Sequence, residues 1–129
     1  MGKVIVVTGG SRGIGAATAR LAAARGHSVC VNYVRDGEAA ERVATDCRRA
    51  GANAVAVQAD VSVEADVVRL FETVDRELGR VTALVNNAGV LERQTRVEDM
   101  DAGRIARVFA VNVNGSFLCC REAVRRMST

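Results

Sequence analysis

Short, solidly apolar runs alternate with longer segments of helical period along the chain. The runs of strand length are Lys3–Val7, Ser28–Tyr33, Asn53–Gln58 and Thr82–Val85. Their apolar character is continuous instead of alternating, as expected of strands in a parallel sheet that is covered on both faces. The pattern therefore predicts an α/β fold with parallel strands joined by helices.

Three predicted helices lie between these strands: Gly13–Arg25, Asp36–Ala50 and Val63–Leu78. Ser62 precedes the third and is expected to cap it with its hydroxyl. A glycine stands where each helix should stop, namely Gly26, Gly51 and Gly79. Right-handed crossovers then give a doubly wound sheet. At 129 residues the chain is expected to form one domain, 1–129.

The segment 97–127 has a helical pattern again. Its apolar side includes Val108, Phe109 and Phe117, and polar residues interrupt it near Asn112 to Gly115. We expect either two consecutive helices or one kinked helix.

Composition limits the possible functions. The net charge of +3 is mild and the arginines are interspersed with acids, so no nucleic-acid surface is indicated. The apolar runs are too short to span a membrane, and no secretory signal is present at the start, so a cytoplasmic protein is expected. The four cysteines form no CxxC motif and the only histidine, His27, falls in a predicted turn; we expect buried thiols and no metal site.

The first predicted strand runs into the glycine-rich segment TGGSRGIG at 8–15, and a helix follows at once. Glycines let a backbone approach a pyrophosphate closely, and a helix start offers free N–H groups to phosphate oxygens. The segment lacks the GK[ST] ending of a nucleotide triphosphatase loop. It therefore favours dinucleotide binding over triphosphate hydrolysis.

With this TGxxxGxG segment, the sequence resembles the short-chain dehydrogenase/reductase family. Further family motifs follow in order: Asp60-Val61 after the third strand, NNAG at 86–89 after the fourth, and the N-x-x-G of Asn112 and Gly115. The resemblance covers essentially the whole chain and implies a Rossmann-like sheet with strand order 3-2-1-4. One departure is Thr82, where the family usually has an aspartate.

The resemblance also implies roles for individual residues. Those around the pyrophosphate and the adenosine ribose would be Gly9, Ser11, Arg12, Gly13, Ile14 and Gly15. Asp60 would accept a hydrogen bond from the adenine amino group, with Val61 against the ring. Those bordering the ribose and the bottom of the cleft would be Asn86, Ala88 and Gly89. Asn112 would hold a water of the family's proton relay, and it is the one candidate catalytic residue.

The end of the second strand bears on which dinucleotide binds. NAD sites place an acid there, whereas NADP sites supply cations for the 2′-phosphate. Here the strand ends with Asn32 and Tyr33, neither of which is an acid, and both are expected among the cofactor-binding residues. Arg12 and Arg35 could bracket a phosphate. Asp36 lies close to the expected acid spacing but is better explained as a helix cap. The sequence therefore favours NADP(H) over NAD.

The family's catalytic Tyr-x-x-x-Lys pair is missing. Tyr33 is the only tyrosine and Lys3 the only lysine, and Gly37 stands four residues after Tyr33. We expect the chain to be the cofactor-binding half of an enzyme, cut before the catalytic Ser, Tyr and Lys. The whole enzyme would be a homo-oligomer.

Three functions are compatible with these features. The first is an NADP(H)-dependent oxidoreductase that interconverts a carbonyl and an alcohol in a small molecule. The Val-Asn-Tyr strand ending is similar to members that act on 3-oxoacyl thioesters or on sugars such as glucose. The second is a non-catalytic dinucleotide-binding or regulatory module. The third, a methyltransferase, is disfavoured by the NNAG motif and Asn112.

Overall fold

Four parallel strands form one sheet in the computed structural model, which describes residues 2–90 and 95–127. Their order is β3-β2-β1-β4, which confirms the predicted doubly wound, Rossmann-like arrangement. The strands are β1 (Lys3–Val7), β2 (His27–Tyr33), β3 (Ala54–Gln58) and β4 (Ala83–Val85). His27, expected in a turn, is the first residue of β2 and pairs with Lys3.

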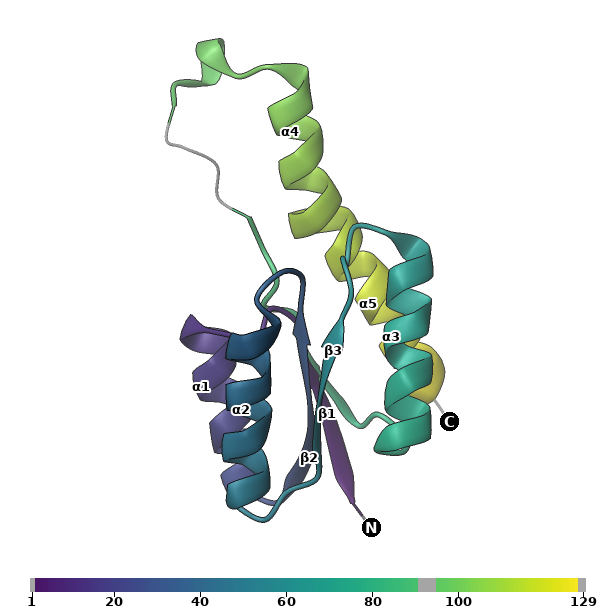
Figure 1. Cartoon of the computed structure of the whole chain (residues 1–129). Helices are drawn as coiled ribbons and strands as arrows, with labels where there is room; N and C mark the ends of the chain where they lie inside the picture. The colour runs from purple at the N-terminus through teal and green to yellow at the C-terminus, as the bar shows by residue number, and fades with distance from the viewer. Residues whose placement is uncertain (1, 91–94, 128–129) are drawn as a thin grey trace.

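Helices cover both faces of the sheet (Figure 1). On one face lie α1 (Gly13–Ala24) and α2 (Gly37–Arg49), and on the other lie α3 (Glu64–Glu77) and α5 (Ser116–Met127). The predicted helices therefore exist, with ends shifted by one residue. The glycines that follow them adopt positive φ angles of 90°, 96° and 108° at Gly26, Gly51 and Gly79.

The two faces of the sheet are packed by side chains of different size. The α1 and α2 face is filled mostly by alanine and valine, which let these helices lie close to the sheet. The α3 face carries the largest buried side chains, Phe71 and Leu70.

A long helical segment leads from the loop after β4 to the end of the described chain. It consists of α4 (Ala102–Phe109), the π-helical turn η2 (Ala110–Gly115) and α5, after a short 3-10 helix η1 (Val97–Asp99). The expected interruption is thus a π-helical turn within a continuous segment. The α4 end projects beyond the sheet (Figure 1). In the described residues, no helix is long and apolar enough to cross a membrane.

Two local predictions are wrong. Ser62 does not cap α3: the capping position is Val63, and the Ser62 hydroxyl donates to Asp60 Oδ1 at 2.6 Å. An acid two residues earlier in the turn competes successfully for the hydroxyl. Of the four cysteines, Cys120 is exposed while the other three are buried.

Thr82 takes part in pairing at the start of β4. Its Oγ1 accepts from Val4 N at 3.0 Å and lies 3.2 Å from Val4 O. Together with the bond from Thr82 N to Val4 O at 2.8 Å, the hydroxyl extends the pairing of β1 and β4 by one residue.

Candidate dinucleotide site

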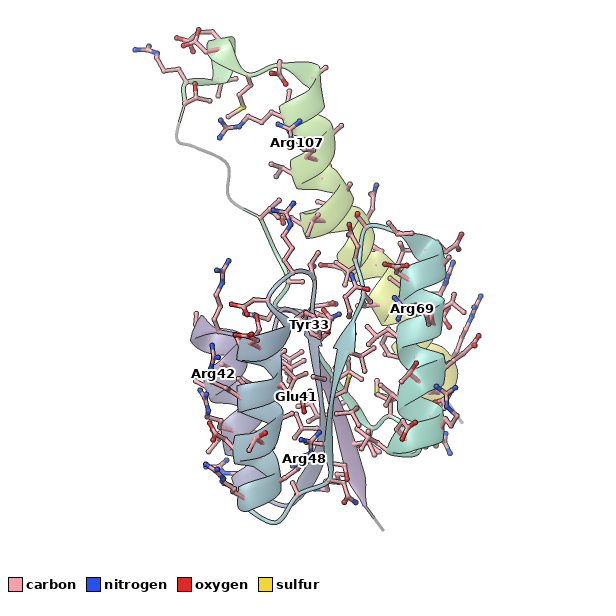
Figure 2. All side chains as sticks on the ribbon, in the orientation of Figure 1. Tyr33, Glu41, Arg42, Arg48, Arg69 and Arg107 are labelled. Atoms are coloured by element: carbon pink, nitrogen blue, oxygen red, sulfur yellow. The ribbon has the colours of Figure 1, made fainter. Side chains whose placement is uncertain are left out.

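A cavity of about 960 Å³ lies at the carboxyl ends of the strands. This is the edge at which open α/β sheets bind ligands. Figure 2 shows Tyr33 at this end of the sheet and Arg107 on α4 beyond it. The predicted site residues that line the cavity are Gly9, Ser11, Arg12, Gly13, Tyr33, Arg35, Asp60, Ala88 and Gly89. The predicted residues outside its lining are Ile14, Gly15, Asn32, Val61, Asn86 and Asn112.

The glycine loop between β1 and α1 is tightly folded. Gly9 has a φ of +60°, and a Cβ at Gly15 would lie 2.4 Å from Gly9 O and 2.6 Å from Asn87 Nδ2. Asn87 Nδ2 donates to Gly9 O at 2.9 Å. A side chain at position 15 would therefore collide with backbone, so the loop requires glycine there.

The start of α1 leaves backbone donors available. Its capping residue, Arg12, makes no side-chain cap bond, and the first turn carries no acid. The first bond back to the cap runs from Ala16 N to Arg12 O at 3.2 Å. The preceding N–H groups, at Gly13 to Gly15, form the positive end of the helix dipole and have no side-chain partner among the residues that the structure describes. Such a terminus suits an anionic ligand.

Thr8 joins the glycine loop to the loop after β4. Its buried Oγ1 accepts from Asn87 N and Ala88 N, each at 3.0 Å, and lies 3.3 Å from Val85 O. Sequence reasoning did not select Thr8 as a site residue. The available signal was a hydroxyl residue at the end of an apolar strand, directly before the glycines.

The segment after β2 places an aromatic ring and a cation at the cavity. Tyr33 and Arg35 both line it. The Tyr33 hydroxyl lies across the start of α2, 3.2 Å from where a Cβ of Gly37 would be. Asp36 caps α2, as predicted, because its Oδ1 accepts from Ala39 N at 3.0 Å. One oxygen of this carboxylate is thereby engaged with the helix, while Asp36 itself also lines the cavity.

Asn32 differs from Tyr33 although the two are adjacent. Its side chain is 1% exposed and is hydrogen-bonded to the glycine loop at Gly9 and to the end of β3 at Val57 and Ala59. It therefore lies beneath the cavity floor instead of in the lining.

The turn after β3 presents Asp60 to the cavity. Asp60 Oδ1 accepts from Ser62 N at 2.9 Å and from Ser62 Oγ, and Asp60 N donates to Asp66 Oδ2 at 2.9 Å. These bonds fix the carboxylate. Val61 is buried beneath it against Gly115, where a Cβ would approach Val61 Cγ2 to 2.7 Å.

Asn112 holds the loop after β4 against η2. Its Oδ1 accepts from Val90 N at 2.8 Å and its Nδ2 donates to Val90 O at 3.1 Å. Gly89 lies directly beside it. Both polar atoms of this side chain are thus bonded to one backbone residue, an arrangement that we term the Asn112–Val90 clasp.

Two further features lie on the side of α4 and α5, one outside the cavity lining and one within it. Asn86, beside β4, donates from Nδ2 to Ser116 O at 3.2 Å and to Cys120 Sγ at 3.1 Å. Arg107 and Val111, one helical turn apart, line the cavity from the α4 side. Sequence reasoning missed this pair, because no motif marks them and only the placement of α4 brings them to the cavity.

Comparison with known proteins points to one family. The family model described as short chain dehydrogenase matches residues 3–129. The chain is 50% identical over 125 residues to the uncharacterized oxidoreductase YgfF of Escherichia coli strain K12, covering 97% of this chain and 51% of that protein. It is 40% identical over 126 residues to cis-4-hydroxycyclohexanecarboxylate dehydrogenase of Sinomonas cyclohexanicum, covering 98% of this chain and 50% of that protein.

Solved structures give the same result. The short-chain dehydrogenase/reductase from Serratia marcescens BCRC 10948 superposes with a TM-score of 0.93 at 36% identity, over 98% of this chain and 51% of that one. The chain belongs to the short-chain dehydrogenase/reductase family. It spans about half the length of the curated relatives it matches.

Proposed function

We propose that this chain is the dinucleotide-binding part of an NADP(H)-dependent oxidoreductase that interconverts a carbonyl and an alcohol. The observation that favours NADP(H) over NAD(H) concerns the surroundings of Arg12 and Arg35. Both line the cavity, and neither pairs with a carboxylate in the part of the chain that the structure describes. The nearby carboxylate of Asp36 also lines the cavity, but its Oδ1 is bonded to Ala39 N as the cap of α2. An anionic 2′-phosphate would satisfy both guanidinium groups.

The other cavity residues fit the remaining parts of the dinucleotide. The open start of α1 suits the pyrophosphate, and the missing Cβ at Gly15 keeps the loop compact beneath it. Asp60 has one carboxylate oxygen bonded to Ser62, and we assign the other to the adenine amino group. The bound dinucleotide supplies the hydride. Residues of this chain bind and orient it.

Proton transfer requires groups that this chain does not contain. Its single tyrosine and single lysine, Tyr33 and Lys3, cannot form the Tyr-x-x-x-Lys pair of the family. We assign acid/base catalysis to residues outside the printed sequence and give Asn112 a supporting role. The substrate is then a small carbonyl or alcohol compound, and the whole enzyme a homo-oligomer.

The test is a pair of binding titrations with NADPH and NADH on the protein expressed from its complete gene. Replacing Arg12 and Arg35 together by alanine is expected to weaken NADPH binding by about tenfold to a hundredfold, with little change for NADH, because charged hydrogen bonds to a phosphate are lost. The matched control is Arg42→Ala, since Arg42 lies on α2 (Figure 2) away from the cavity lining.

Two results would overturn parts of the proposal. An unchanged NADPH to NADH affinity ratio in the double variant would exclude Arg12 and Arg35 as phosphate ligands. Tight NADPH binding without reduction of any carbonyl substrate would instead support a non-catalytic dinucleotide-binding module.

A further inference from the structure

Asn32 is a polar side chain buried in the middle of the sheet. It is 1% exposed, and it stands at the end of β2 between the glycine loop and β3. A buried amide is costly unless its polar atoms are bonded. Its hydrogen bonds therefore indicate what it does.

The Asn32 residue holds two successive amides of the glycine loop. Its Oδ1 accepts from Gly9 N at 3.2 Å, and its backbone carbonyl accepts from Gly10 N at 2.8 Å. Gly9 is the residue with a φ of +60°, where the loop turns away from β1. One residue of β2 thus fixes the point at which the loop begins.

The other end of the amide is anchored in β3. Asn32 Nδ2 donates to Val57 O at 3.2 Å and to Ala59 O at 3.1 Å. Ala59 directly precedes Asp60, which lines the cavity. The side chain therefore ties the glycine loop to the segment that carries Asp60, with β2 between them.

We infer that Asn32 is a positioning residue, which sets the glycine loop and the Asp60 turn in the relative placement that dinucleotide binding requires. It does so without touching the ligand, since it does not line the cavity. This inference rests on the proposed function. It predicts that Asn32 contributes to the affinity for both dinucleotides and leaves the choice between NADP(H) and NAD(H) unchanged.

The first test is Asn32→Ala in the protein expressed from its complete gene, titrated with NADPH and with NADH. The side-chain bonds to Gly9 N, Val57 O and Ala59 O are lost, so both affinities are expected to fall by about fivefold to tenfold, with their ratio unchanged. Asn32→Asp is the second variant. It keeps an acceptor for Gly9 N but sets a carboxylate against the carbonyls of Val57 and Ala59, and it is expected to lower both affinities as well.

The matched control is Val29→Ala. Val29 is fully buried on the same strand, so its truncation lowers stability by loss of packing without a bond to the loop. Its dinucleotide affinities are expected to stay at the wild-type values. An equal loss of affinity in Val29→Ala would show that the effect of Asn32 is general destabilisation. A changed NADPH to NADH ratio in either Asn32 variant would show direct contact with the 2′ group.

Amide hydrogen exchange tests the same inference without any ligand. The Gly9 and Gly10 amides are expected to exchange faster in both Asn32 variants than in Val29→Ala, and equal exchange would overturn the positioning role. The exchange experiment thus distinguishes a failure of the inference about Asn32 from a failure of the proposed function. If the wild-type protein bound neither NADPH nor NADH, the proposed function would fail, whereas the exchange data would still decide whether Asn32 orders the loop.

Discussion

The helices α4 and α5 are two halves of one helical segment, yet only α5 is built into the core. It buries Cys119, Glu122 and Ala123 on the α3 side of the sheet. By contrast, none of the residues of α4 is buried, and Phe109 is 55% exposed. A single helical segment thus has two roles: α5 packs in the core and contributes to stability, whereas α4 forms part of the cavity wall.

The half on the sheet is held by an ionic cluster. Glu122, whose side chain is 5% exposed, has three arginine partners at 2.9 to 3.0 Å, namely Arg121, Arg125 and Arg126. Arg126 also bonds Asp75 on α3 at 3.0 Å and lies 5.3 Å from the centre of the Phe71 ring. The half beside the cavity is attached through the Asn112–Val90 clasp. We therefore expect changes in α5 to affect stability and changes in α4 to affect local order.

The largest effect is expected for Glu122→Gln. This change keeps the shape of the side chain but leaves three arginines without their shared anion, so the free energy of unfolding should fall by about 2–3 kcal/mol. Denaturant unfolding measures it. The control is Glu64→Gln, which removes an exposed partner of Arg121 and should cost about 0.5 kcal/mol or less.

The Glu122→Gln variant also tests how the contribution of Glu122 to stability depends on pH. Burial alone would raise the pKa of Glu122, but hydrogen bonds from Arg126 and Arg121 outweigh it and hold that pKa below its ordinary value. Stabilisation by the charged form is thus complete above the unfolded-state pKa of about 4.3 and is lost as pH falls through the lower, folded value. The stability gap between wild type and Glu122→Gln should be constant from about pH 7 to pH 5 and shrink below that. A gap that grew on acidification would contradict this assignment.

The next effect concerns the junction of the two halves. A Cβ at Gly115 would lie 2.7 Å from Val61 Cγ2 and 3.0 Å from Val61 O, so Gly115→Ala must displace the helix from the Asp60 turn. The expected loss is about 1–2 kcal/mol of unfolding free energy, as for other overpacked sites. Thermal unfolding measures this loss. An unchanged midpoint would show that the helix can move away from Val61 at little cost.

A smaller effect on stability is expected for Asn112→Ala. Two hydrogen bonds at an exposed position are lost, at a cost of about 1 kcal/mol. Because the clasp holds α4 beside the cavity, amide exchange should increase in α4 while α5 keeps its protection. Equal loosening of both halves would show that they form one cooperative unit.

The smallest expected effect is a gain in the stability of α4. Gly103 lies in the first turn of α4, and an added Cβ would make only ordinary contacts, at 3.4 Å from Arg107 Nη1 and Asp101 Oδ1. Gly103→Ala should stabilise α4 by up to about 0.5–1 kcal/mol through helix propensity. Slower amide exchange in α4, with an unchanged unfolding midpoint, is the expected result.

Much of this architecture follows from the sequence, because strand and helix periods are local properties. The four strands, three of the helices, their glycine ends and the Asp36 cap were predictable in this way. The failures arise where a contact depends on tertiary placement. Ser62 bonds Asp60 instead of capping α3, and Cys120 is exposed on a helix whose outer side the pattern could not orient.

In the candidate site, too, local motifs could be recognised in the sequence, whereas contacts that depend on tertiary placement could not. The glycine loop, Arg35 and Asp60 carry recognisable motifs, and the structure brings them to one cavity. Asn32, at the end of β2, is buried beneath that cavity instead of lining it, and burial at a strand end cannot be inferred from spacing alone. Arg107 reaches the cavity only because a helix distant in sequence passes there.

The π-helical turn Ala110–Gly115 also sets the rotational phase of the long helical segment. In a regular α-helix, residues four apart drift by about 40° around the axis, and a wider turn offsets part of this drift. Five positions spaced four apart carry the inward contacts of the segment: Arg107, Val111, Gly115, Cys119 and Ala123. The first two face the cavity, the third abuts Val61, and the last two are buried. Deleting one residue from the turn would rotate the cavity wall by about 100° relative to the core.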